Sequence, residues 1–133
     1  NEKIAQAWFA GQMSWANAMD ASLVYYQRVG RFDEAARVAV NVAMAFPFEA
    51  NPRFVAGSVM LKDGQTRRAL PWLRSAAELD SRNPKYLMAL AQGYYEAGMF
   101  RESAVVLERV LLVEPEHPTA PQYLERARAA AQG

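Results

Sequence analysis

Residues 84–117 read PKYLMALAQGYYEAGMFRESAVVLERVLLVEPEH, and the pattern of this stretch recurs twice earlier in the chain. Three glycines, Gly30, Gly64 and Gly98, stand 34 residues apart. Other columns repeat in step with them, namely Ala35, Ala69 and Ser103; Ala39, Leu73 and Leu107; Val42, Ala76 and Val110; and Pro47, Ser81 and Pro115. This period is typical of arrays built from a repeated helix pair. The sequence therefore predicts an all-α fold of stacked antiparallel helix pairs.

The repeated columns resemble the tetratricopeptide repeat. That family has an aromatic residue in the first helix, a glycine at the turn, an aromatic residue opening the second helix, a small residue soon after, and a closing proline. The first unit matches with Tyr26, Gly30, Phe32, Ala35 and Pro47. The third matches with Leu90, Tyr94, Gly98, Phe100 and Pro115.

The middle unit departs from the family pattern at three positions, which hold Met60, Thr66 and Ser81. Gly57 still supplies a small residue where two helices are expected to approach closely. The family's early tryptophan is missing from all three units, where Met19, Arg53 and Leu87 stand. The resemblance spans residues 16–117 and specifies a fold much more strongly than an activity.

The resemblance implies a single domain, a right-handed α-solenoid over residues 1–133. Its expected parts are a partial helix at 1–15, repeats at 16–49, 50–83 and 84–117, and a capping helix at 118–133. A polar-faced last helix is what such an array needs to cover its final apolar face. The expected inter-helix core contains Ala35, Ala69, Leu73, Tyr94, Leu107 and Val110.

Local signals place several helix ends. We expect helices at about 14–28 and about 32–45, separated by the turn at Gly30. Asn51-Pro52 and Asn83-Pro84 each predict a capping side chain followed by a proline at the first helical position. Pro71 falls about five residues into an expected helix, where it removes a backbone hydrogen bond, so we expect a bend or a frayed first turn.

The first 15 residues, NEKIAQAWFAGQMSW, do not make a full repeat. Ile4 and Trp8 lie on one face of a helix, which suggests the second helix of an earlier repeat. Trp8, Phe9 and Trp15 either pack on the first full repeat or leave an aromatic surface that faces another subunit or the missing part of a larger array. A contact with another subunit would make the chain a homo-oligomer.

Composition excludes several classes of function. The 133 residues are 52% hydrophobic and 22% charged, with a net charge of +1, so no strong field attracts nucleic acid or an anionic membrane. No apolar run approaches the roughly 20 residues that span a bilayer. The absence of cysteine removes thiol catalysis and thiolate metal sites, but leaves the compartment open between bacterial cytoplasm and periplasm. Frequent alanine and arginine favour a GC-rich bacterial source.

The motifs of catalysis are missing from the sequence. His117 is the only histidine, and it is interpreted as a solvated loop residue between Glu116 and Pro118. There is no Gly-rich phosphate loop and no cluster with metal-ligand spacing, so we expect no cofactor and no metal. The remaining charged candidates are interpreted as solvated, namely Asp80, Glu114, Glu116, Arg67, Arg68, Arg126 and Arg128. The chain is therefore predicted not to be an enzyme.

The concave face of a solenoid is lined by the first helix of each pair, and its residues are free to meet a ligand. The family resemblance maps this groove onto Asp20, Val24, Gln27, Phe54, Ser58, Leu61, Lys85, Met88, Gln92 and Tyr95, with Asn17, Arg28, Asn51, Lys62 and Glu96 beside them. An apolar strip with a polar rim suits an extended or helical peptide. The alternative is that these residues only solvate a groove or pack against the chain's own terminus.

One subfamily of this fold holds the C-terminal carboxylate of chaperone peptides with a lysine and an asparagine in its first repeat and further basic residues later. Here the first-repeat positions hold Asp20 and Val24, and Lys85 alone matches the later set. The sequence therefore argues against that chaperone-tail function.

These observations predict a non-catalytic protein-interaction scaffold that binds a peptide or helix in its concave groove. Two alternatives stay open: an accessory domain of a larger enzyme or bacterial secretion machine, and a self-assembling scaffold. Because the sequence begins with Asn1, a longer parent protein is also expected.

Overall fold

The computed structural model describes residue 26 and residues 28–133, and within these it consists of helices and the turns that join them. Six helices follow one another without an intervening strand in this part of the chain: α2 (Phe32–Ala45), α3 (Ala50–Lys62), α4 (Thr66–Leu79), α5 (Pro84–Glu96), α6 (Phe100–Val113) and α7 (Ala120–Gln132). The all-α prediction is confirmed, and α2 spans the range expected for it.

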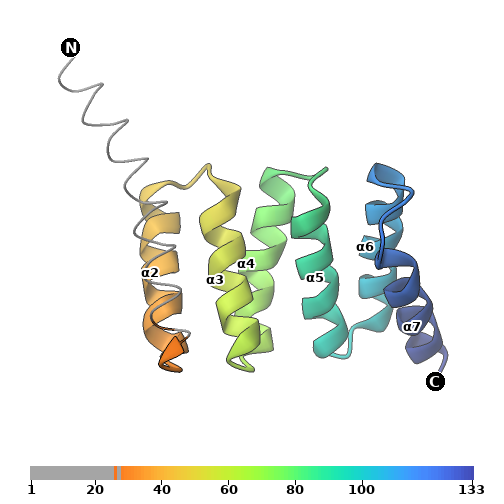
Figure 1. Cartoon of the computed structure of the whole chain (residues 1–133), viewed down its shortest axis with the longest axis horizontal. Helices are drawn as coiled ribbons and strands as arrows, with labels where there is room; N and C mark the ends of the chain where they lie inside the picture. The colour runs from red at the N-terminus through yellow and green to blue at the C-terminus, as the bar shows by residue number, and fades with distance from the viewer. Residues whose placement is uncertain (1–25, 27) are drawn as a thin grey trace, which may run out of the picture.

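The helices stand side by side in a row, each antiparallel to the one before it, and the described chain runs along the row from α2 to α7 (Figure 1). Each helix packs on the next one in the sequence, and α3 also contacts α5. Two helices that are not consecutive, α3 and α5, thus share a surface, as first helices of neighbouring pairs do in a solenoid. None of the described helices is long and apolar enough to cross a membrane.

The three repeated glycines make the turns. Gly30, Gly64 and Gly98 have φ values of 74°, 78° and 78°, and no other described residue has a positive φ. After Gly98 the Met99 N–H donates to the Tyr94 carbonyl over 2.8 Å, which closes the end of α5. The predicted turn positions are confirmed.

Small residues set the close spacing of the helices. Leu73 on α4 is fully buried and lies between Gly57 on α3 and Gly93 on α5. A Cβ atom on Gly57 would lie 2.6 Å from Leu73 Cγ, and one on Gly93 would lie 3.0 Å from Leu73 Cδ1. The expected close approach at Gly57 is therefore confirmed.

The predicted core is buried at Ala35, Ala69, Leu73, Leu107 and Val110. Tyr94 was expected to join it and is only half-buried. Its hydroxyl accepts a 3.3 Å hydrogen bond from Arg74 Nε in an exposed setting, so the phenol keeps its polar end toward water.

Two expectations about helix starts need correction. Asn83 does cap α5, with Oδ1 accepting from the Lys85 N–H at 3.0 Å. Asn51 does not cap α3, because that helix already begins at Ala50. Pro52 is still tolerated, since the first four N–H groups of a helix have no partner inside it.

Pro71 lies inside α4, whose first turn is formed from Thr66 onward, so the expected frayed first turn is wrong. Arg53, which stands at the family's tryptophan position in the second unit, places its guanidinium 5.8 Å from the Trp72 ring centroid. It also donates to Ser75 Oγ at 2.7 Å and to the Pro47 carbonyl at 3.1 Å. Arg53 thus ties α3 to α4 and to the preceding loop.

Three expectations concern residues outside those that the structure describes. They are the partial helix at 1–15, the helix at about 14–28, of which only Tyr26 and Arg28 are described, and the aromatic segment with Trp8 and Trp15. The division into three repeats also stays a prediction.

Candidate functional groove

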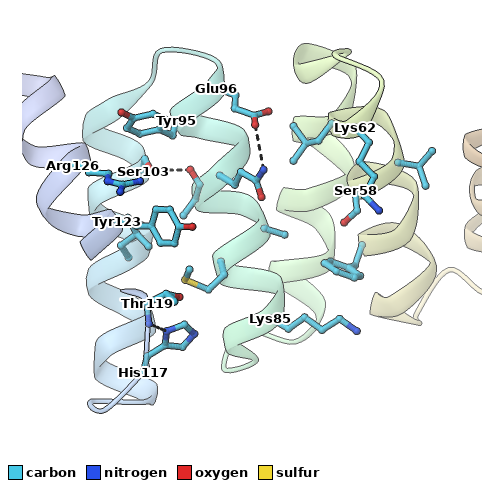
Figure 2. A pocket seen from close by; sticks show the side chains of 18 of the residues that line it. Ser58, Lys62, Lys85, Tyr95, Glu96, Ser103, His117, Thr119, Tyr123 and Arg126 are labelled. Atoms are coloured by element: carbon cyan, nitrogen blue, oxygen red, sulfur yellow. Dashed lines mark hydrogen bonds between the residues drawn. The ribbon is translucent and has the colours of Figure 1, made fainter. Parts of the chain in front are cut away.

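A groove of about 940 Å³ opens between α3, α5 and the C-terminal part of the chain. Figure 2 shows its lining, with Ser58 and Lys62 on one side, Tyr95 and Glu96 at one end, and Tyr123 and Arg126 on the opposite side. The groove is lined by residues of α3, α5, α6 and α7 and of the loop before α7, whereas α4 does not contribute to it. It is a product of the stacking and not of any one repeat.

Helical spacing explains why α3 and α5 present these residues together. Residues three or four positions apart lie on the same face of a helix. Phe54, Ser58 and Leu61 follow this spacing on α3, while Ala56, Val59 and Met60 are buried. On α5 the groove face is made by Lys85, Met88, Gln92 and Tyr95, while Tyr86, Leu87, Leu90 and Ala91 are buried.

The structure brings together seven of the ten residues that the sequence singled out, namely Phe54, Ser58, Leu61, Lys85, Met88, Gln92 and Tyr95. Lys62 and Glu96 line the same groove, whereas Arg28 and Asn51 do not. Asp20, Val24, Gln27 and Asn17 fall outside the described residues. That these residues bind a peptide stays a prediction.

The apolar part of the groove is held by aromatic contacts. The rings of Phe54 and Tyr86 lie 5.2 Å apart, and the Lys85 ammonium lies 4.7 Å above the Phe54 ring. Tyr95 packs edge-on against Phe100 at 5.1 Å and remains 40% exposed. Such geometries are favourable for aromatic pairs and fix the orientation of the rings. Phe54 and Tyr95 are therefore partly exposed and held in place.

Two polar interactions shape the groove wall. Gln92 Nε2 donates to Glu96 Oε1 at 3.2 Å, one turn further along α5. The buried hydroxyl of Ser103 on α6 donates to the Ala91 carbonyl at 2.8 Å. The Ser103 hydroxyl therefore links α6 to the backbone of α5 by a hydrogen bond.

Sequence reasoning missed the contribution of the C-terminal helix. His117, Thr119, Tyr123 and Arg126 all line the groove. Arg126 was interpreted as a solvated residue; it is exposed, but its guanidinium lies 5.6 Å from the Tyr123 ring centroid at the groove wall. The signal was present, because residues 119, 123 and 126 have the three-and-four spacing that marks the groove face of α5.

His117 is not a simple solvated loop residue. It is half-buried, and its Nδ1 accepts hydrogen bonds from the Thr119 N–H at 3.2 Å and the Ala120 N–H at 3.0 Å. These are backbone donors at the start of α7, which a helix cannot satisfy internally. His117 therefore caps α7 and positions the helix that carries Tyr123 and Arg126.

Cations outnumber carboxylates in the lining, where Lys62, Lys85 and Arg126 face a single acidic residue, Glu96. No group of three or more candidate metal ligands occurs among the described residues. In Figure 2 Lys85 and His117 lie toward the end of the groove opposite Glu96.

The fold and the groove together define a helical-repeat solenoid with a ligand-sized concavity on one face. A sequence profile of the tetratricopeptide repeat matches residues 60–131, more than half of the chain. The chain belongs to the tetratricopeptide repeat family. A comparison with curated protein sequences gave no match.

Solved structures support the fold. The first tetratricopeptide domain of Spaghetti (RPAP3), bound to an HSP90 peptide, has a TM-score of 0.80 at 19% identity, covering 90% of this chain and 95% of that one. The second such domain of human RPAP3, in complex with an HSP70 peptide, has a TM-score of 0.76 at 19% identity, covering 87% and 93%. The Yersinia enterocolitica secretion chaperone SycD, in complex with a peptide of the translocator YopD, has a TM-score of 0.76 at 15% identity, covering 87% and 93%.

Proposed function

We propose that this chain is a non-catalytic interaction scaffold that holds a peptide or a short helix of a partner protein in its concave groove. The observation that carries the proposal is the row of large apolar side chains at the groove, Phe54, Leu61, Met88 and Tyr95, on first helices whose other faces form the core. Phe54, Leu61 and Met88 pack partly against the core and also line the groove, where a bound peptide would cover their remaining apolar surface.

The dimensions of the groove suit a peptide. Its volume of about 940 Å³ lies at the upper end of the range of small-ligand sites, so it admits several side chains of a longer chain. The apolar floor gives affinity, while the polar groups of Ser58, Gln92 and Glu96 at its edge set orientation.

Similar proteins use this fold to bind peptides. The structures of the RPAP3 domains contain HSP90 and HSP70 peptides, and that of SycD contains a translocator peptide. At 15–19% identity these likenesses concern the fold, so they support the class of ligand and leave its sequence open.

The test begins with a random peptide library displayed on phage and selected on the whole chain. A selected peptide is then synthesised, and its Kd is measured by fluorescence anisotropy. Alanine at Phe54 or Tyr95 should weaken binding by about 1–2 kcal/mol each, about fivefold to thirtyfold in Kd, because each removes a preordered apolar anchor. Circular dichroism should show unchanged helicity.

The control is the variant Arg67→Glu with Arg68→Glu, on exposed positions of α4 that do not line the groove. It should leave the Kd within about twofold, since exposed charges that do not line the groove contribute little to affinity at a distance. Unchanged binding by both alanine variants, or loss of binding in the α4 control, would contradict groove binding.

A further inference from the structure

The C-terminal helix does more than cover the end of the array. Two side chains of α7, Tyr123 and Arg126, stand one turn apart and line the groove opposite α3 (Figure 2). A neighbouring face of α7 buries Ala120, Leu124 and Ala127 against the array. The helix is thus held firmly by one face and presents an aromatic and a cationic side chain to any ligand with another.

Arg126 differs from its neighbour Arg128 in what it contacts. Arg128 Nη2 lies 3.0 Å from Glu108 Oε1 on α6 and forms an ion pair outside the groove. Within residues 28–133 no carboxylate forms an ion pair with Arg126, whose guanidinium packs near the Tyr123 ring at 5.6 Å from its centroid. Because no acidic side chain of that part of the chain occupies them, the N–H groups of Arg126 are available to a ligand, and a guanidinium matches a carboxylate in two-point fashion.

Lys85 repeats this arrangement on α5. Its ammonium lies 4.7 Å from the centre of the Phe54 ring, and no carboxylate pairs with it in the described part of the chain. Two cations are therefore held beside aromatic anchors of the groove, each without an acidic partner in that part. The one carboxylate in the lining, Glu96, accepts from Gln92 at the other end from Lys85.

We infer that the groove selects segments of a partner protein in which apolar residues are flanked by carboxylates, one carboxylate meeting Arg126 of α7 and another meeting Lys85 of α5. This inference rests on the proposed groove binding and specifies, in addition, that the bound segment is acidic. The selected feature is acidic side chains along an apolar segment, and Tyr123 and Arg126 become specificity-determining residues of the C-terminal helix.

Complementary charge has two measurable consequences. Binding of an acidic ligand weakens as salt screens the attraction, and replacing a cation by a carboxylate penalises acidic ligands selectively. An apolar ligand without charge shows neither effect. The two consequences therefore separate recognition of charge from recognition of shape.

The experiment compares matched peptides on the whole chain. Peptides selected by phage display are sequenced, and one is synthesised with its Glu and Asp residues and again with Gln and Asn in their place. The acidic peptide should bind at least about tenfold more tightly at low ionic strength than its amide analogue, and the advantage should shrink in high salt. Arg126→Glu and Lys85→Glu should each cost the acidic peptide about tenfold and leave the amide analogue nearly unaffected.

Arg128→Glu is the matched control, because it makes the same change of charge on the same helix outside the groove and should leave both affinities nearly unchanged. Equal affinity of the two peptides, with binding still lost in Phe54→Ala, would overturn the charge preference and keep the groove. Selected peptides rich in Lys and Arg would also overturn it. Peptides whose binding depends on neither Phe54 nor Tyr95 would remove the proposed function as well.

Discussion

At the scale of single residues, two different physical effects require glycine in this chain: backbone conformation at one position and lack of space at another. Gly98 has a φ of 78° and open space around the position of a Cβ atom, so strain there comes from the backbone alone. Gly57 has an ordinary helical backbone and lacks space, because Leu73 occupies the site a side chain would fill. The same residue type is therefore required for two separate physical reasons.

Replacing Gly98 with valine should lower the free energy of unfolding by roughly 1 kcal/mol or more, because a β-branched residue is strained at positive φ. Gly98→Asn is the control, since asparagine tolerates this conformation better than other side chains and should cost less. Urea denaturation of both variants measures the difference. Equal stability of the valine variant and the wild type would reject the turn assignment.

Tyr86 makes the stability sensitive to alkaline pH. Burial raises the pKa of its phenol above the ordinary value, and the carboxylates of Asp80 and Glu49 raise it further. Because the folded-state pKa is the higher one, the neutral phenol's contribution is complete below the unfolded pKa of about 10 and is lost as the pH rises through the folded pKa.

The measurement is the unfolding free energy of the wild type and of Tyr86→Phe at about pH 8 and about pH 11, on either side of the ordinary tyrosine pKa. The wild type should lose more stability across this interval than Tyr86→Phe, in which no phenolate forms at this site. Parallel losses in the two proteins would show that Tyr86 is not responsible.

At the scale of the element, some helix starts can be predicted from the local sequence and others cannot. Asn83 caps α5 as its sequence predicts, because the asparagine, Pro84 and the Lys85 N–H that it accepts from are three consecutive residues. The equivalent expectation at Asn51 fails, since α3 starts at Ala50 and places Pro52 within its first turn. A start two residues earlier depends on tertiary packing of α3 and is not visible in the local pattern.

His117 stabilises the start of α7 through two backbone N–H groups. His117→Ala should therefore cost roughly 0.5–2 kcal/mol, as the loss of other helix caps does. The loss should appear as faster hydrogen exchange at the start of α7 and as weaker binding of the groove peptide, because Tyr123 and Arg126 lose their support. Glu116→Ala, one residue away, is the control, and equal effects of the two variants would refute a specific cap.

Leu73 packs between three successive helices of the array. It is fully buried on α4 and contacts both Gly57 of α3 and Gly93 of α5, so it spans a helix pair and the next pair along the chain. Leu73→Ala should lower the free energy of unfolding by about 2–5 kcal/mol, from lost transfer energy and the cavity left behind. A loss well below that range would mean that the neighbouring helices collapse onto the site.

At the scale of the whole molecule, the all-α repeat fold of the described residues was predictable because three glycines and their columns recur in register. The same register placed Phe54, Leu61, Met88 and Tyr95 on one side of the array. The share of the groove made by Tyr123 and Arg126 was not predicted. The signal was present in the three-and-four spacing of residues 119, 123 and 126, and Thr119 and Arg126 stand 34 residues after Lys85 and Gln92, but the last helix was interpreted only as a cap. The half-exposed position of Tyr94 was also not predicted. Its hydroxyl accepts a hydrogen bond from Arg74 on the neighbouring helix α4, and the repeat pattern does not indicate that contact.

Site-specific photo-cross-linking tests the central claim, that the concave groove holds the partner, most directly. A benzophenone amino acid replaces Tyr95 at the groove in one variant, and in another it replaces Val105, an exposed residue of α6 that does not line the groove. With a selected peptide present, the account predicts a covalent peptide adduct from position 95 and none from position 105, as read by mass spectrometry. An adduct from position 105 alone, or cross-links from position 95 only to residues 1–25 of the same chain, would contradict it.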